Sequence, residues 1–265
     1  MLLAVDIGNT NIVLGLFDGD RGGTSSASTP VHDWRMRTDA RMTADEMALT
    51  VRGLLGDYVG KITGIAALST VPALLRELKT MVDRYWPQLP RVIVEAGVRT
   101  GVPLLYDNPR ELGADRIVNT LAAYTLYGGP AIVVDFGTST NFDVVSARGE
   151  FLGGALAPGI EISIDALATR AAQLVKVQLV RPRSVIGKST VEALQSGLLF
   201  GFAGQVDGLV ARIAAELAPG AEADVVVIAT GGLAPLLIAE SQTITHHAPH
   251  LTLRGLRMVF DRNIS

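Results

Sequence analysis

Along the chain, the hydrophobic residues fall mainly in short runs that end in small polar residues. The first run, Leu2–Asp6, resumes at Ile12–Phe17 after the segment GNTN, which predicts a hairpin with that segment at its bend. The segment AIVVDFGTSTNFDVVSARGEFLGGAL at 131–156 has the same order of strand, Asp-x-Gly turn, second strand and glycine-centred turn. This shared order predicts an internal repeat, in which Asp6 and Asp135 are the equivalent acids.

Between the two hairpins, stretches with the hydrophobic spacing of a helix alternate with stretches that have the spacing of a strand. Thr43 and Glu46 form a capping-box pattern ahead of a periodic apolar stretch, so we expect a helix to begin there. We expect strands over 64–70 and 91–97, and a helix that begins near Pro72. Alternating strands and helices predict an α/β protein.

The second half of the chain continues with one long helical stretch. We expect a helix over about Thr190–Leu217, with Ser189 or Thr190 as its N-cap, and strands over 224–232 and 252–260. Glycine, serine and threonine dominate 19–30, which predicts a loop.

Composition and charge narrow the class of protein. The 265 residues are 48% hydrophobic and 18% charged, and no apolar run approaches the roughly 20 residues that span a bilayer, so we expect no membrane partner. The net charge of −3 provides no basic field for nucleic acid. The chain has no cysteine, which excludes thiol chemistry, and its first residues, MLLAVDIG, lack a basic leader, so we expect a cytoplasmic protein.

The two Asp-x-Gly turns are candidate phosphate sites. A tight turn of glycine, hydroxyl and amide residues can present several backbone N–H groups to phosphate oxygens. Ordinary hairpin turns use the same residue types, so one such turn would decide nothing. Two turns, each beside an acid that could hold Mg²⁺ or a monovalent ion, favour a phosphate function.

Two other patterns resemble known sites less well. VIGKST at 185–190 resembles a P-loop, but Pro182 stands where that motif requires glycine, and a helix start is the better interpretation. No carboxylate or helical pattern of the zincin kind accompanies His246, His247 and His250, so we expect a solvated loop there.

The segment GADRIVN, which begins at Gly113, has a different character. Apolar spacing predicts a helix that places Asp115 and Arg116 in its first turn. Asp115 there could simply cap the helix. Arg116 is unfavourable at that end of the helix dipole, and a ligand carboxylate would provide it with an anionic partner.

Several motifs, in this order and spacing, closely resemble the type III pantothenate kinases: DIGNTN, DNPRELGADRIVN, DFGTSTNFD, GGALAPGIEIS and GKSTVEALQSG. That family belongs to the superfamily of acetate kinase, sugar kinases, Hsp70 and actin. The resemblance implies an α/β fold of two duplicated RNase-H-like domains, as in actin-like ATPases, with a central interdomain cleft. We expect these domains at 1–125 and 126–265. The implied reaction is ATP-dependent phosphorylation of pantothenate to 4'-phosphopantothenate, the first step of coenzyme A biosynthesis.

The resemblance also implies site residues. It assigns ATP binding to Asp6, Ile7, Gly8, Asn9, Thr10, Asn11, Ile12, Val13 and Thr138. It assigns pantothenate binding to Tyr106, Gly113, Ala114, Asp115, Arg116 and Thr190. Asp115 resembles the catalytic base, Asp6 lies near Mg²⁺ through water, and Asp135 resembles the ligand of K⁺ or NH₄⁺. Thr190 resembles a residue that reaches the site of a neighbouring subunit, which implies a homodimer.

Two small departures and two alternatives accompany this interpretation. Ser139 and Asn141 stand where alanine and threonine are expected, but neither has an assigned role. We also treat Asp115 as an ordinary carboxylate, with a pKa of ~3.9. Two alternative functions stay open. One is another kinase of the superfamily, which acts on a sugar or acetate, and the other is a non-catalytic nucleotide-binding regulator of the same fold.

Overall fold

The computed structural model describes residues 1–18, 29–170 and 177–264. The chain forms two compact units, the first made of Met1–Pro103, Asp107–Leu126 and His250–Ser265, and the second of Leu104–Tyr106 and Tyr127–Pro249. The expected division into 1–125 and 126–265 is contiguous in sequence, but the two units are not. Leu104–Tyr106 belongs to the second unit, and His250–Ser265 belongs to the first. The expected loop at 19–30 lies almost entirely outside the described residues.

The first unit contains a five-stranded sheet of order β3-β2-β1-β4-β5. The strands are β1 Leu2–Ile7, β2 Asn11–Phe17, β3 His32–Arg37, β4 Gly64–Ser69 and β5 Arg91–Ile93. β1, β2 and β3 are antiparallel neighbours, whereas β4 and β5 run parallel to β1. The predicted hairpin is confirmed, and the strand expected over 91–97 has only three residues.

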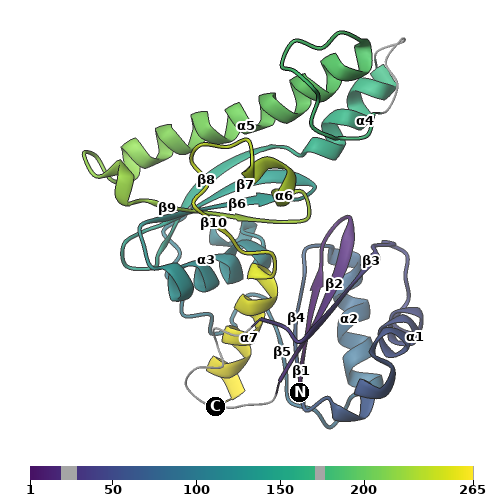
Figure 1. Cartoon of the computed structure of the whole chain (residues 1–265). Helices are drawn as coiled ribbons and strands as arrows, with labels where there is room; N and C mark the ends of the chain where they lie inside the picture. Colours follow the sequence, from purple (N-terminus) through teal and green to yellow (C-terminus); the bar gives the residue numbers. More distant parts are fainter. Residues whose placement is uncertain (19–28, 171–176, 265) are drawn as a thin grey trace. The chain divides into compact units, whose positions relative to one another are not determined.

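Helices cover both faces of this sheet (Figure 1). One face packs on α1 Ala44–Leu55 and α2 Pro72–Tyr85, which enclose a core with Ile7 and Ile12. The short 3₁₀ helix η2, Gly56–Lys61, follows α1. The Thr43–Glu46 capping box is present, which confirms the predicted start of α1.

The other face packs on the C-terminal helix α7, Leu251–Ile264, so the strand expected over 252–260 is wrong. In that segment Gly255 lies against the backbone of Val118 in α3, Ala114–Tyr127, and Phe260 lies against Gly64 of β4. The helix is therefore buried on two sides. Over short windows, LTLR and LRM, apolar and polar residues alternate in this segment, so a short stretch of it imitates the pattern of a strand.

The second unit repeats the sheet, in the order β10-β9-β6-β7-β8. Its strands are β6 Ala131–Phe136, β7 Ser139–Val145, β8 Phe151–Pro158, β9 Val226–Thr230 and β10 His246–His247. β6 pairs antiparallel with β7 and parallel with β9, as β1 does with β2 and β4. β1 and β6 also share one burial pattern, with a half-buried acid as the fifth residue. The predicted internal repeat is confirmed.

The described part of this second unit contains the helices α4 Ile160–Arg170, α5 Thr190–Leu217 and α6 Ala234–Ile238 (Figure 1), and the short 3₁₀ helix η4, Glu222–Asp224. The predicted long helix and its Ser189 N-cap are confirmed, because the Ser189 side chain accepts from the N–H of Glu192. Among the described residues, α5 is the one helix long and apolar enough to cross a membrane, which the sequence did not lead us to expect. Its buried apolar residues line the core of the second unit, and 33% of its apolar 18-residue window is buried.

Candidate functional site

The first Asp-x-Gly turn is fixed by hydrogen bonds from two later threonines. Within the turn, the N–H of Gly8 donates to the carbonyl of Asn11 at 3.0 Å. Thr38 donates its hydroxyl to the carbonyl of Gly8 at 2.7 Å and its N–H to that of Thr10 at 3.0 Å. The N–H of Thr70 donates to the carbonyl of Ile7 at 2.9 Å. Sequence reasoning missed Thr38 and Thr70, because each lies far along the chain from the turn.

The predicted ATP segment Asp6–Val13 divides between two faces of the sheet. Ile7 and Ile12 are fully buried in the core under α1 and α2, so their side chains point away from any ligand at the turn. Other members lie half-buried on the opposite face or exposed at the bend: Asp6, Asn9, Thr10, Asn11 and Val13. Only these side chains, and the backbone, are placed to meet a ligand.

The second Asp-x-Gly turn is shorter than the first. Only Gly137 and Thr138 separate β6 from β7, and the N–H of Gly137 donates to the carbonyl of Ser139 at 3.0 Å. The N–H of Gly159 donates to the carbonyl of Thr138 at 3.1 Å. A side chain at position 159 would collide with the carbonyls of Gly137 and Thr138, so this close approach requires glycine.

Asp135 lies directly opposite Asn141 of β7 and Thr230 of β9. The hydroxyl of Ser139 donates to Oδ1 of Asn141 at 2.7 Å. The two departures from the family pattern are thus bonded to each other, and one of them is the cross-strand neighbour of Asp135. Carboxylate, amide and hydroxyl oxygens on one face are donors that suit a hard cation.

Gly231 closes the other side of Asp135. It follows β9 with φ of +91°, and a methyl group built there would lie 2.6 Å from Asp135 Oδ1. A side chain at this position is therefore excluded both by backbone conformation and by the carboxylate.

Asp115 lies in the first turn of α3, where its carboxylate folds back over Gly113. A side chain at position 113 would collide with Asp115 Oδ1. Burial raises the pKa of Asp115 above its ordinary value of 3.8, although the N–H and the positive charge of Arg116 act in the opposite direction. The expectation of an ordinary carboxylate is therefore wrong, because the sequence does not reveal this burial.

The position of α3 is set by contacts with α7. Gly255 allows the two helices to approach at Val118, and the hydroxyl of Thr252 donates to Oδ1 of Asn119 at 2.9 Å. Since α7 packs on the sheet of β1 and β4, the first unit holds both the Asp6–Val13 segment and the Gly113–Arg116 segment.

The remaining predicted site residues belong to the second unit. Tyr106 packs edge-on against Phe151 at 5.7 Å between ring centroids, beside the close approach of Leu104 to the same strand. Thr190 is the exposed first residue of α5. Asp135 and Thr138 complete this group.

Two of the three histidines lie in a strand rather than in the expected loop, and His250 lies in the turn before α7. His246 and His247 form the short edge strand β10, and the ring of His246 contacts that of Tyr127 at a tilt of 56°, with 4.9 Å between centroids. Nε2 of His250 lies 3.9 Å from Oδ1 of Asp33. Across residues 1–18, 29–170 and 177–264, no group of three or more His, Cys, Asp or Glu side chains is placed to hold a metal ion.

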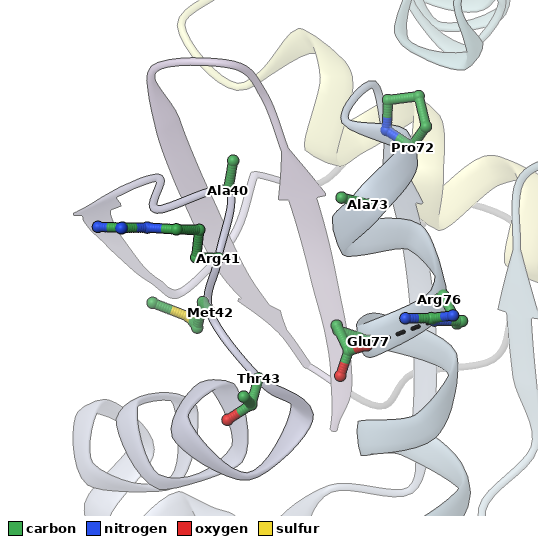
Figure 2. A pocket seen from close by; sticks show the side chains of 8 residues that line it. All are labelled: Ala40, Arg41, Met42, Thr43, Pro72, Ala73, Arg76 and Glu77. Atoms are coloured by element: carbon green, nitrogen blue, oxygen red, sulfur yellow. Dashed lines mark ion pairs between the residues drawn. The ribbon is translucent and has the colours of Figure 1, made fainter.

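An open groove lies between the segment before α1 and the start of α2 (Figure 2). Its volume is about 580 Å³, and Arg76 and Glu77 form an ion pair of 3.5 Å on one wall. Glu77 also accepts from the N–H of Ala44 at 3.0 Å, so it joins the two helices. None of the predicted site residues lines this groove.

Comparisons with known proteins show the family of this chain. The family model described as type III pantothenate kinase matches residues 2–212. A type III pantothenate kinase from Saccharopolyspora erythraea is 69% identical over 263 residues, which cover 99% of each chain.

Solved structures with the same fold are distant in sequence. The activator of 2-hydroxyisocaproyl-CoA dehydratase from Clostridium difficile, with bound ADPNP, is similar with a TM-score of 0.56 and 11% identity, and the match covers 98% of this chain and 94% of that one. The polyphosphate/ATP-glucomannokinase from Arthrobacter sp. strain KM has a TM-score of 0.52 and 13% identity, with 98% and 97% covered. These similarities support the expected actin-like ATPase fold of duplicated domains. The chain belongs to the type III pantothenate kinases, which catalyse the first step of coenzyme A biosynthesis.

Proposed function

We propose that Asp115 is the base for transfer of the γ-phosphoryl group of ATP to the primary hydroxyl of pantothenate. The hydroxyl oxygen forms a bond to phosphorus as the bond to the β-phosphate oxygen breaks, and Asp115 takes the hydroxyl proton. The observation that carries this role is the half-buried Asp115 carboxylate, held over Gly113 with its pKa raised. A raised pKa makes a carboxylate a better proton acceptor while it remains ionised.

The ATP phosphates are held by backbone groups of the two Asp-x-Gly turns, at Asp6–Val13 and Thr138. The bracing of the first turn by Thr38 and Thr70 supports this role, because a fixed turn binds phosphate without an ordering cost. Phosphoryl transfer depends mainly on positioning and charge stabilisation, so a rigid turn contributes directly to it.

The two acids serve different cations. Asp6 would hold Mg²⁺, with water between them, and Asp135 would hold K⁺ or NH₄⁺. The oxygen donors of Asp135 and its neighbour Asn141 fit a hard monovalent cation. When bound, these ions offset phosphate charge. Each site has a single carboxylate, which suits a cation whose other ligands are substrate oxygens and water.

Pantothenate is bound by the segment Gly113–Arg116 together with Tyr106 and Thr190. Arg116 pairs with the pantothenate carboxylate, because a guanidinium forms bidentate bonds with that group. Ala114 and Gly113 contribute backbone at the start of α3, the end of a helix that attracts anions.

The enzyme works as a homodimer in the cytoplasm. Val185 and Ile186, just before α5, are 66% and 72% exposed, and Val191 in its first turn is 43% exposed. Such a concentration of exposed apolar side chains around Thr190 suits coverage by a second copy. The partner would then share the site at Thr190.

An acceptor screen tests the reaction. Purified protein is incubated with labelled Mg²⁺-ATP, K⁺ and either pantothenate, acetate or hexoses, and labelled product is measured. We expect label in 4'-phosphopantothenate alone. Phosphorylation of a sugar or acetate in its place would identify another kinase, and failure to rescue a strain lacking pantothenate kinase would favour the regulator.

A further inference from the structure

Two arginines share a sheet face with the Asp6 carboxylate. In the antiparallel registers, Asp6 lies opposite Val13, which lies opposite Arg35, so these three form one row across β1, β2 and β3. Asn11 and Arg37 form the next row on the same face. The alternate residues Ile12 and Met36 point to the core on the other face. Arg35 and Arg37 therefore stand on the face of Asp6, at the edge next to the first turn.

The helix α7 covers only the other half of this face. Leu253 lies against Gly15 in β2, and Phe260 lies against Gly64 in β4. The helix starts at the level of Asp33, which is opposite Gly15 and lies near His250. Beyond that level the rows of Arg35 and Arg37 are not covered by α7, and both arginines are exposed.

Hydrogen bonds from the residue next to Arg37 link the end of β3 to the first turn. That residue, Thr38, holds the carbonyls of Gly8 and Thr10, so the end of β3 and the turn form one hydrogen-bonded assembly. Asp6 and Arg35 are two strand spacings apart, or about 10 Å, a span that a triphosphate with its Mg²⁺ can bridge. Within the described part of the chain, neither Arg35 nor Arg37 forms an ion pair with a carboxylate.

The first turn itself has no cationic side chain. The segment Asp6–Val13 reads DIGNTNIV, and the whole chain has a net charge of −3. A triphosphate carries several negative charges, and backbone N–H groups supply only partial positive charge. The nearest cations fixed to this turn by the register are on β3.

We propose that Arg35 and Arg37 are phosphate-binding residues for the ATP held at the first turn. This inference rests on the proposed function in placing ATP there. Arginine suits the role because its planar guanidinium donates paired hydrogen bonds to phosphate oxygens and stays charged. The competing explanation is that these charges merely protect an exposed edge strand from pairing with other chains. In that case their loss would leave nucleotide binding unchanged.

The test uses Arg35→Gln, Arg37→Gln and the double variant of the full chain. The dissociation constant of Mg²⁺-ATP is measured by calorimetry at two salt concentrations, together with the KM values for ATP and pantothenate. The matched control is Arg76→Gln, an exposed arginine of α2, which packs on the opposite face of the same sheet. Thermal denaturation confirms that each variant is folded.

We expect the double variant to bind Mg²⁺-ATP at least tenfold more weakly, with a smaller salt dependence and an unchanged KM for pantothenate. Arg76→Gln should match the wild type. An ATP affinity of the double variant within twofold of wild type would overturn the inference, as would a rise confined to the KM for pantothenate. Arg37→Lys should restore part of the affinity if the charge is what matters.

The outcome is separable from the proposed function. If the wild-type protein phosphorylates pantothenate while the double variant keeps its ATP affinity, only the arginine inference fails. If the wild-type protein binds Mg²⁺-ATP but phosphorylates no pantothenate, the proposed reaction fails. A loss of that binding in the double variant would then still support the two arginines.

Discussion

The hydroxyl of Thr38 donates a 2.7 Å hydrogen bond to the carbonyl of Gly8, 30 residues earlier in the chain. This bond joins the end of β3 to the turn between β1 and β2. We expect Thr38→Val to raise the KM for ATP severalfold with little change in the KM for pantothenate, and to lower stability by about 1 kcal/mol. Steady-state kinetics and urea denaturation measure both effects. The control is Thr80→Val, whose hydroxyl bonds within the exposed side of α2, and equal KM values for the two variants would contradict a role for Thr38.

The Asp115 carboxylate occupies the space that a side chain at position 113 would need, so a larger residue there has to displace that carboxylate. We expect Gly113→Ala to displace that carboxylate and lower kcat at least tenfold, while the affinity for ATP stays close to wild type. The control, Gly53→Ala, adds a methyl group to α1 where no atom lies within 4 Å. That change should leave kcat unaltered and stabilise the helix by up to about 1 kcal/mol. A normal kcat in Gly113→Ala would refute the positioning.

Asp115→Asn should lower kcat by roughly 10²–10⁴, the usual contribution of a general base. Burial raises the pKa of Asp115 in the folded protein, so the ionised carboxylate lowers the free energy of unfolding. This loss of stability grows as pH rises through the pKa of the folded state. The inactive variant should therefore have a higher Tm than the wild type at pH 7. The gain should shrink as pH falls toward the ordinary carboxyl value of 3.8. Calorimetry from pH 8 to pH 4 measures this, and a lower Tm at pH 7 would contradict the pKa direction.

Asp135 and its neighbour Gly231 test the monovalent cation site. We expect Asp135→Ala to lose activation by K⁺, whereas Asp6→Asn should weaken the use of Mg²⁺-ATP. Gly231→Ala should also reduce activation by K⁺, because its methyl group would lie 2.6 Å from Asp135 Oδ1. Rates measured across K⁺ and Mg²⁺ titrations separate the two acids. A full K⁺ response in Asp135→Ala would disprove the assignment.

Asp207 of α5 holds a distant turn of the second unit. Its carboxylate accepts from the hydroxyls of Ser241 at 2.6 Å and Thr243 at 2.8 Å. Burial acts to raise the pKa of Asp207, but these bonds and backbone N–H groups outweigh burial and lower it below 3.8. A carboxylate whose pKa is lowered by folding stabilises the folded protein at pH values above its pKa in the unfolded chain. That stabilisation is lost as pH falls through the pKa of the folded state.

We therefore expect Asp207→Ala to lower the Tm at pH 7, with a smaller difference from wild type at pH 3. The control is Glu216→Gln, an exposed position on the same helix, which should leave the Tm unchanged at both pH values. A difference that does not depend on pH would show that packing, rather than the charge, matters.

Much of the fold could be predicted because local signals were strong. The Thr43–Glu46 capping box, the Ser189 N-cap and the two hairpins all depend on neighbouring residues, and each is confirmed. The C-terminal helix was mistaken for a strand because apolar and polar residues alternate over short windows of that segment, whereas its packing on Gly64 and Val118 depends on partners remote in sequence.

The motifs by themselves determined the family and the set of candidate residues, since a motif is a property of order and spacing. Tertiary structure decided which of those side chains face a ligand. Ile7 and Ile12 point into the core, while Arg35 and Arg37 reach the face of Asp6 only through the strand register. Tertiary structure also decided the pKa direction of Asp115, because burial depends on atoms that fold around a side chain.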